Sequence, residues 1–149
     1  MVYIYYMIIT KDNINQFIEP NFQLTMDCSD SGITEISYIP KNIERLYCNN
    51  NQLTSLPKLP DSLTHLYCYE NKLTELPKLP DGLKYLYCHS NRLTELPKLP
   101  ESLEYLDCSF NNLPYEVTLD NYKEKHNKFI KRNGTGIVFC NKFSIKNSK

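Results

Sequence analysis

Residues 43–60 read IERLYCNNNQLTSLPKLP, and the same pattern begins again at Leu63, at Leu83 and, in a shortened form, at Leu103. The interval between copies is constant along the chain. Three columns of equivalent residues show this: Cys48, Cys68, Cys88 and Cys108; Asn51, Asn71, Asn91 and Asn111; Leu53, Leu73, Leu93 and Leu113. A fixed period of this length is typical of a solenoid, in which each repeat forms one coil that packs against its neighbours.

A degenerate copy of the unit precedes the clean ones. Its apolar and proline positions, found one period before those of the next copy, are Met26, Cys28, Ile33, Ile36, Ile39 and Pro40. The turn Asn is replaced by Ser31, and Gln23 occupies the first apolar position. We therefore predict five coils over residues 21–113, the first of them degenerate.

The alternation Leu66-Tyr67-Cys68 predicts a short strand in each coil, with Leu66 and Cys68 inward and Tyr67 outward. Stacked coils then form a parallel sheet on the concave side, with strands about 4.8 Å apart. A buried Asn amide after each strand can bond backbone groups left unpaired at the bend, which predicts a ladder of Asn51, Asn71, Asn91 and Asn111. The proline-rich second half of the unit is too short for a helix, so we expect an extended, polyproline II-like convex face.

The pattern L-x-x-L-x-C-x-x-N-x-L resembles the leucine-rich-repeat signature over residues 43–113. With L-P-x-L-P in its second half, the unit is most similar to the short bacterial-effector subclass, the YopM and IpaH type. Similar repeats occur in proteins of large DNA viruses, and the Asn, Lys, Ile and Tyr bias here suits an AT-rich genome. The resemblance implies an α/β-type leucine-rich-repeat solenoid that binds other proteins.

Proteins of the IpaH type join such repeats to a large ubiquitin-ligase domain with a catalytic Cys in a Cys-x-Asp motif. Here only residues 114–149 follow the last repeat, and the one Cys-x-Asp, Cys28-Ser29-Asp30, falls in phase with the repeat. We therefore expect no ligase activity and, more generally, no enzymatic activity.

Residues 1–20 are predicted to form an N-terminal cap, because the ends of a solenoid otherwise expose apolar edges. We expect a strand over residues 1–9 and then a short amphipathic helix with Thr10 as its N-cap and Pro20 as its end. Its apolar face would consist of Ile14, Phe17 and Ile18.

Residues 114–149 are predicted to form a C-terminal cap and tail. A helix is expected over residues 119–132, with a strand over residues 137–140 after it. The helix is basic, with Lys123, Lys125, Lys128, Lys131 and Arg132, and a solvated cap is favoured over an anion-binding role.

The formal net charge is zero, with 17 basic and 17 acidic residues, so charge does not support a nucleic-acid or membrane partner. Residues 1–9 are apolar, but they lack a preceding basic stretch and a following cleavage site, and they are too few to span a bilayer as a helix. We predict an intracellular protein, in the cytoplasm (of a host cell for an effector or viral protein), with reduced thiols.

The five cysteines in phase, Cys28, Cys48, Cys68, Cys88 and Cys108, suggest a metal or redox site at first sight. A straight row of sulfurs cannot surround zinc tetrahedrally, and parallel side chains in register do not turn easily toward one another to form disulfides. We predict that these cysteines are core residues, with no metal and no cofactor. Cys140 lies outside this ladder and has no interpretation.

The outward strand positions form the candidate binding surface. The first row is Arg45, His65, Tyr85 and Tyr105; the second is Tyr47, Tyr67, Tyr87 and Asp107; the third is Asn49, Tyr69, His89 and Ser109. Tyr offers rigid, amphipathic contact area and is favoured in recognition surfaces. Aromatic rows on adjacent strands can equally stabilise the sheet itself and bind nothing. Both interpretations stay open at this point.

The histidines give no catalytic pattern. His65 and His89 lie in different rows and coils without a Ser or acidic residue fixed beside them by the repeat, and His126 lies outside it.

The favoured function is a non-enzymatic module that binds a protein partner on its concave face, as a monomer and without nucleic acid. One alternative is a fragment or adaptor related to effector ubiquitin ligases without the catalytic domain, with any chemistry in the terminal segments. Another is a repeat protein with no specific activity.

Overall fold

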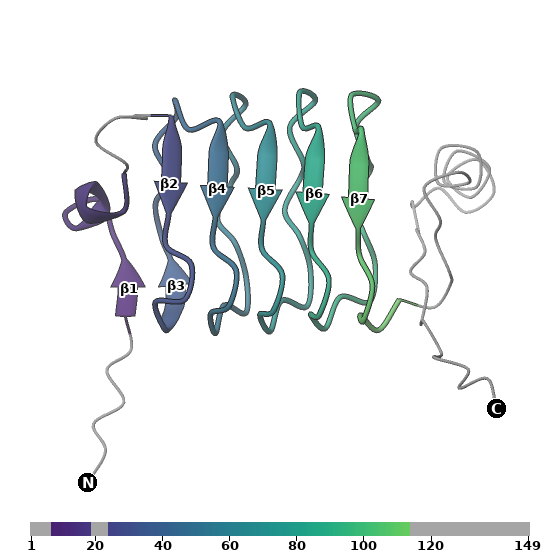
Figure 1. Cartoon of the computed structure of the whole chain (residues 1–149), viewed down its shortest axis with the longest axis horizontal. Coiled ribbons are helices and arrows are strands. Elements are labelled where there is room, and N and C mark those ends of the chain that lie inside the picture. The colour runs from purple at the N-terminus through teal and green to yellow at the C-terminus, as the bar shows by residue number, and fades with distance from the viewer. Residues whose placement is uncertain (1–6, 19–23, 114–149) are drawn as a thin grey trace, which may run out of the picture.

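The computed structural model describes residues 7–18 and 24–113, which form a row of stacked coils (Figure 1). Each coil contributes one short strand to a parallel sheet, in the order β2-β4-β5-β6-β7. The strands are β2 (Thr25–Asp27), β4 (Arg45–Tyr47), β5 (His65–Tyr67), β6 (Tyr85–Tyr87) and β7 (Tyr105–Asp107). Leu66 pairs with Leu46 on one side and with Leu86 on the other, so one repeat makes one coil. The predicted parallel-strand solenoid is confirmed.

The inward columns form one continuous hydrophobic core. Leu46, Leu66 and Leu86 have no exposed surface, and the same is true of Cys48, Cys68 and Cys88. Cys28 and Cys108, in the first and last coils, are also buried, and none of the five cysteines is in a disulfide. The sulfurs thus occupy the positions that the alternation in each strand directs inward.

The Asn side chain after each strand joins two successive coils. Asn71 Nδ2 donates to the carbonyl oxygens of Cys48, Cys68 and Tyr69 at 2.9, 3.2 and 3.2 Å, and Asn71 Oδ1 accepts the Leu53 N–H at 3.0 Å. The same arrangement recurs at Asn51, Asn91 and Asn111. The four amides therefore satisfy buried backbone groups that the bend leaves without ladder partners.

The residue before each ladder Asn, and before Ser31 in the degenerate coil, has a left-handed backbone. The residues at this position, with φ between 51° and 54°, are Asp30, Asn50, Glu70, Ser90 and Phe110. Asp and Asn tolerate this conformation better than other side chains do. Phe110 is also 60% exposed, so its ring is not held by packing there.

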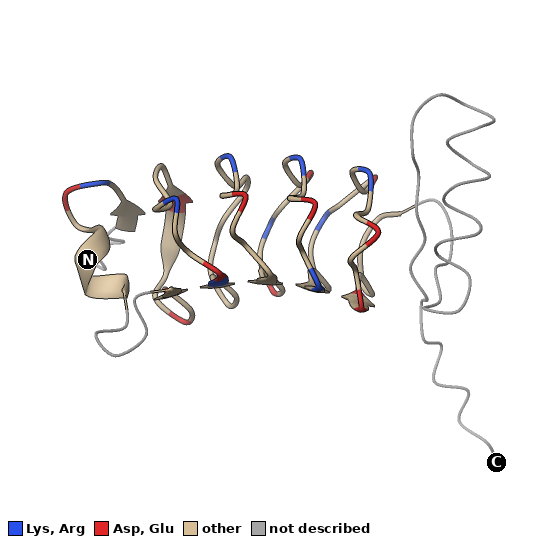
Figure 2. Cartoon of the chain, turned by 90° about the horizontal axis from the view of Figure 1, so that it is seen from above, with Lys and Arg blue, Asp and Glu red and all other residues tan. Residues whose placement is uncertain are grey.

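The second half of most coils is irregular. Residues 48–64, 68–84 and 88–104 contain no helix or strand. Viewed from above, basic and acidic residues recur at equivalent places in successive coils, as the repeat requires (Figure 2). The degenerate coil differs, because its second half contains β3 (Ile33–Ile36), which pairs in parallel with β1 (Met7–Ile9).

The N-terminal segment covers the first coil, but not with the predicted helix. Residues Ile14–Phe17 form only one turn of 3-10 helix, η1, and its N-cap position is Asn13, so the prediction of Thr10 as N-cap is wrong. Asn13 Oδ1 instead accepts the Thr10 N–H at 2.8 Å. Four residues, preceded and interrupted by Asn, are too few and too weak in propensity to continue as an α-helix. Ile14 and Phe17 are nevertheless buried in the same core as the repeats.

The described part of the chain ends at Leu113. The predicted helix over residues 119–132, the strand over residues 137–140, His126 and Cys140 lie outside it. The assignment of residues 1–20 and 114–149 as caps stays a prediction.

Candidate binding face of the sheet

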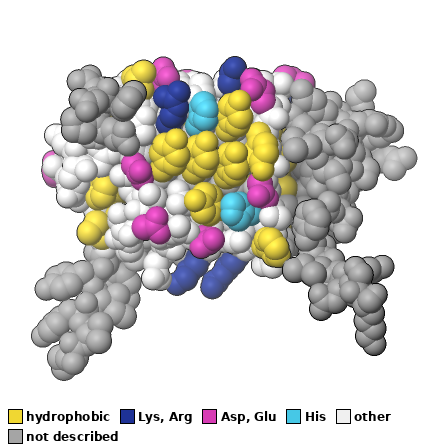
Figure 3. Space-filling view, in the orientation of Figure 1, with side chains coloured by type: hydrophobic (Ala, Val, Ile, Leu, Met, Phe, Trp, Pro, Cys, Tyr) yellow, Lys and Arg dark blue, Asp and Glu magenta, His cyan; other side chains and the backbone are white. Residues whose placement is uncertain are grey.

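The outward side chains of the five-stranded sheet lie on one face, where a band of aromatic side chains crosses the strands (Figure 3). We call this the sheet face. Its predicted members are all half-buried: Arg45, Tyr47, His65, Tyr67, Tyr69, Tyr85, Tyr87, His89, Tyr105 and Asp107. Asn49, which the sequence places in the third row, is only 6% exposed and so contributes little surface.

Three tyrosines of the second row stack face to face. The ring centroids of Tyr47 and Tyr67 are 4.6 Å apart, and those of Tyr67 and Tyr87 are 4.7 Å apart, with interplanar angles of 11° and 12°. This spacing matches the distance between neighbouring strands, because side chains in register follow the backbone. Asp107 interrupts the row in the last coil, and Tyr87 stacks instead on Tyr105 of the first row, at 4.6 Å and 26°.

Both histidines take part in the same kind of contact. His65 stacks on Tyr85 with centroids 4.6 Å apart, and His89 stacks on Tyr69 at 4.5 Å. The inner rings of the band, Tyr67 and Tyr87, therefore have both faces covered by neighbouring rings. The sheet face presents ring edges and hydroxyl groups to a ligand, so stacking of a nucleic-acid base or a sugar on the inner rings is excluded.

The hydrogen bonds of Thr64 indicate the tautomer of His65. Thr64 Oγ1 donates its single proton to the Glu44 carbonyl at 3.0 Å and lies 2.8 Å from His65 Nδ1. Nδ1 then carries the proton that Thr64 accepts, and Nε2 is the acceptor of the neutral ring. Burial, followed by the charges of Arg45 and Lys84, lowers the pKa of His65, so the neutral form is favoured at pH 7.

His89 lies beside a carboxylate. Its Nδ1 is 3.3 Å from Asp107 Oδ2, yet this nitrogen is buried and their geometry does not make a hydrogen bond. The two groups are therefore close neighbours without a hydrogen bond between them. Asp107 Oδ1 accepts both the N–H and the hydroxyl of Ser109, at 3.0 and 2.7 Å, which fixes the carboxylate in the sheet face.

A small polar cluster borders the first row. Lys84 Nζ lies 2.9 Å from Glu104 Oε1, and the Tyr85 hydroxyl donates to Glu104 Oε2 at 3.0 Å. The hydrogen bonds from Lys84 and Tyr85 lower the pKa of Glu104, which stays ionised. Because these groups are exposed, the cluster orients the Tyr85 ring more than it stabilises the fold.

Tyr67, Tyr69 and Tyr105 keep their phenolic protons at neutral pH. Burial raises the pKa of Tyr67, Tyr69 and Tyr105 above the ordinary value of 10.0, and neighbouring phenols add to the effect at Tyr67. Each hydroxyl can therefore both donate and accept a hydrogen bond. Among the residues described, no three His, Cys, Asp or Glu side chains are placed to hold a metal ion.

Sequence reasoning missed one member of this face. Asp27 pairs in register with Tyr47 and so continues the second row into the degenerate coil. The signal was present in the sequence, because Asp27 lies one period before Tyr47.

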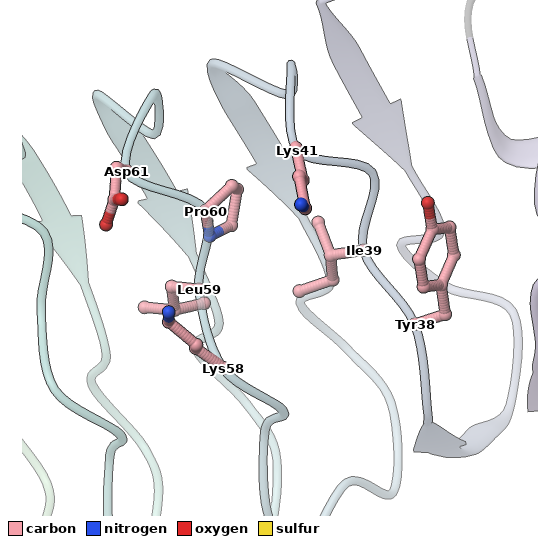
Figure 4. A pocket seen from close by; sticks show the side chains of 7 residues that line it. All are labelled: Tyr38, Ile39, Lys41, Lys58, Leu59, Pro60 and Asp61. Carbon is pink, nitrogen blue, oxygen red and sulfur yellow. The ribbon is translucent and has the colours of Figure 1, made fainter.

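A different surface feature is a groove of about 360 Å³ between the first two coils (Figure 4). Its lining residues are Tyr38, Ile39, Lys41, Lys58, Leu59, Pro60 and Asp61. A similar groove lies one coil further on, lined by Lys58, Pro80 and Asp81 among others. Because the Pro-Asp turn recurs with the repeat, these grooves reflect the stacking of coils and do not single out one site.

In the described ranges, residues 7–18 and 24–113, no helix has the length and apolar character needed to cross a membrane.

Comparison with known proteins identifies the repeat. A family model described as "Leucine Rich repeats (2 copies)" matches residues 41–81. Among solved structures, YopM from Yersinia enterocolitica WA-314 is similar, with a TM-score of 0.62 and 37% identity over 67% of this chain. The leucine-rich-repeat domain of a Shigella effector is similar, with a TM-score of 0.66 and 33% identity over 72% of this chain. No curated protein sequence matches.

The chain spans 22% of the YopM chain and 51% of the Shigella effector chain. Both structures resemble this chain in fold and also in sequence, with identities of 37% and 33%. The chain is therefore a leucine-rich-repeat protein, with repeats of the bacterial-effector-like type.

Proposed function

We propose that this protein is a non-enzymatic interaction module that binds a protein partner on its sheet face. Leucine-rich repeats are in general protein-protein interaction modules, and the two similar structures are effectors or effector domains. The observation that carries the proposal is the difference between the two sides of each strand. The inner columns repeat Leu and Cys, whereas equivalent outer positions vary, as in Arg45, His65 and Tyr85.

The chemistry of the face suits a protein ligand. Half-buried tyrosines held by stacking are already ordered, so binding costs little side-chain entropy. Their hydroxyls offer hydrogen bonds to backbone groups and polar side chains. The partner would act in the cytoplasm of a host cell if the protein works as an effector.

The stacking also supports the competing interpretation, in which the rings only stabilise the sheet. Tyr67 has Tyr47 on one face and Tyr87 on the other, so replacing it with Ala removes two ring contacts at once. Loss of capture by such a variant would not separate the two interpretations. A test has to keep an aromatic ring in the row.

Site-specific photo-crosslinking meets this requirement. We would place p-benzoylphenylalanine at position 67, in the sheet face, and as a matched control at position 78, where Lys78 is exposed on another side of the same coil. The proposal predicts light-dependent adducts of defined mass from position 67 in cells, with the partner identified by mass spectrometry. Position 78 should give none of the same adducts.

Tyr67→Phe and Tyr87→Phe provide a second test of the same face. These changes keep the stacked rings and remove the hydroxyls, so the melting temperature should change little while capture of the crosslinked partner weakens. Adducts from position 78 alone, or no adduct from position 67, would contradict the proposal.

A further inference from the structure

We infer that the partner segment bound by the sheet face is basic, an extended polypeptide with at least two Lys or Arg side chains about six residues apart. The inference rests on the proposed function, because it names the chemistry of the ligand for the same face. It comes from the carboxylates that surround the aromatic band.

The tyrosine row begins and ends with an aspartate. Asp27 pairs in register with Tyr47, and Asp107 pairs in register with Tyr87. Both are held in the same way: Oδ1 of Asp27 accepts the N–H and hydroxyl of Ser29 at 2.9 and 2.7 Å, and Oδ1 of Asp107 accepts those of Ser109 at 3.0 and 2.7 Å. Each carboxylate is thus oriented through its Oδ1 atom, and its Oδ2 atom can accept a hydrogen bond from a ligand. In Asp107, Oδ2 also lies 3.3 Å from His89 Nδ1.

Further carboxylates lie beside the rows. Asp30 and Glu70 are close enough to Tyr69 to raise its pKa, and Glu44 and Glu104 act on the pKa of His65 in the same direction. Arg45 lies in the first row, and Lys84, which lies near His65 of that row, is paired with Glu104 at 2.9 Å. Figure 3 shows an acidic side chain at each end of the aromatic band, with both acidic and basic side chains above and below it.

The stacking of the rings restricts where a cation can bind on the sheet face. A Lys or Arg cannot lie over the inner rings, since their faces are covered by neighbours at 4.6 to 4.7 Å. It can donate to the phenolic oxygens along the band and to the carboxylates at its ends. An acidic segment would meet uncompensated repulsion at both ends of the band, and a neutral segment would leave both aspartates without an opposite charge.

The spacing follows from the sheet. Asp27 and Asp107 are four strand steps apart, which is roughly 19 Å at about 4.8 Å for each step. An extended chain rises about 3.3 Å per residue, so cations about six residues apart reach both carboxylates.

The test uses the full chain and a random dodecapeptide library displayed on phage. We expect the enriched peptides to be net positive, with two Lys or Arg about five to seven residues apart. A synthetic peptide of enriched sequence should bind the variant with both Asp27→Asn and Asp107→Asn about tenfold more weakly, and its affinity for the unmodified chain should fall as salt is added. Asn keeps the Oδ1 acceptor used by Ser29 and Ser109, so the fold is preserved.

The matched control carries Asp61→Asn and Asp81→Asn, which remove the same charge from the grooves on another side of the coils. It should bind the peptide as the unmodified chain does. Enrichment of neutral or acidic peptides would overturn the inference that the partner segment is basic. If position 67 still crosslinks to a partner in that case, the proposal that the sheet face binds a protein stands. Absence of enrichment, or equal weakening in both double variants, would also overturn it.

Discussion

Asn71 Oδ1 accepts the backbone N–H of Leu53 at 3.0 Å, across 18 residues and from one coil to the previous one. The bond is buried, and the same amide donates to three carbonyl oxygens. One side chain thus bonds four backbone groups, and its bonds to the Leu53 N–H and to the Cys48 and Cys68 carbonyls are buried. This relationship makes neighbouring coils depend on each other for polar satisfaction as well as for apolar burial.

Replacing this amide should be costly. Asn71→Ala leaves the Leu53 N–H and three carbonyls with fewer partners, and we expect it to lower the free energy of unfolding by roughly 2 to 4 kcal/mol. Urea denaturation followed by circular dichroism measures the change. The control is Asn112→Ala, at an exposed Asn beside the ladder, which should change stability by less than about 0.5 kcal/mol. Equal effects of the two substitutions would contradict the role of the ladder.

Gly82 interrupts a column of serines. Ser62 Oγ donates to the carbonyls of Lys41 and Ile43 at 2.9 and 2.7 Å, and Ser102 makes the equivalent bonds at 2.7 Å. A Cβ at position 82 would meet nothing within 4 Å. Gly82→Ser should therefore stabilise the protein by about 1 to 2 kcal/mol, from a restored hydrogen bond and reduced chain entropy in the unfolded state.

Gly82→Ala separates the two contributions, because Ala restricts the unfolded chain but supplies no hydroxyl. We expect a gain of about 0.5 to 1 kcal/mol for Ala in chemical denaturation. A serine variant no more stable than the alanine variant would rule out the hydrogen bond.

Glu70 adopts a φ of 51° at the position where Asn50 and Asp30 stand in earlier coils. A Glu in this conformation carries backbone strain that Asn relieves, so Glu70→Asn should stabilise by roughly 0.5 to 1 kcal/mol. Glu70→Gln removes the same charge without relieving strain and serves as control. If thermal unfolding shows the same gain for both variants, charge and not backbone conformation is responsible.

The columns of the solenoid were predictable because each depends on a local alternation repeated at one period. Leu66 inward and Tyr67 outward followed from the strand pattern, and Met26 and Cys28 followed from a step of one period back along the chain. The same logic would have found Asp27 in the tyrosine row. It would also have indicated a turn at Glu70, from the Asn and Asp at equivalent positions.

Other features depend on tertiary context that no local pattern reports. The pairing of β1 with β3 joins a segment outside the repeat to the irregular half of the first coil. The contact of Tyr87 with Tyr105 arises because Asp107 leaves the row open, so the ring partner changes from one column to the next. The single 3-10 turn at Ile14 was predicted as a longer helix because its apolar spacing fits both, and only length distinguishes them.

The contribution of ring stacking to the free energy of unfolding can be measured separately from that of the tyrosine hydroxyl. Tyr67→Ala should lower the free energy of unfolding by about 2 to 3 kcal/mol, because it removes buried area and two ring contacts. Tyr67→Phe keeps both contacts and should cost less than about 0.5 kcal/mol. Differential scanning calorimetry distinguishes the two variants, and an unchanged midpoint for Tyr67→Ala would show that the rings do not support the sheet.

Equivalent positions of successive repeats lie in straight columns with the cysteines inside, and every assignment of an inner or outer face depends on this. Pulsed alkylation of the native chain with iodoacetamide at pH 8, read out by mass spectrometry for each cysteine, tests this most directly. Burial raises the pKa of Cys68 from 9.0 to about 12, and that of Cys48 and Cys88 well above 9.0, so native thiolate is scarce and shielded. We predict that these three thiols stay unmodified in the native chain for a time that alkylates them fully in urea; rapid native labelling of any one of them would contradict the inward placement of the cysteine column.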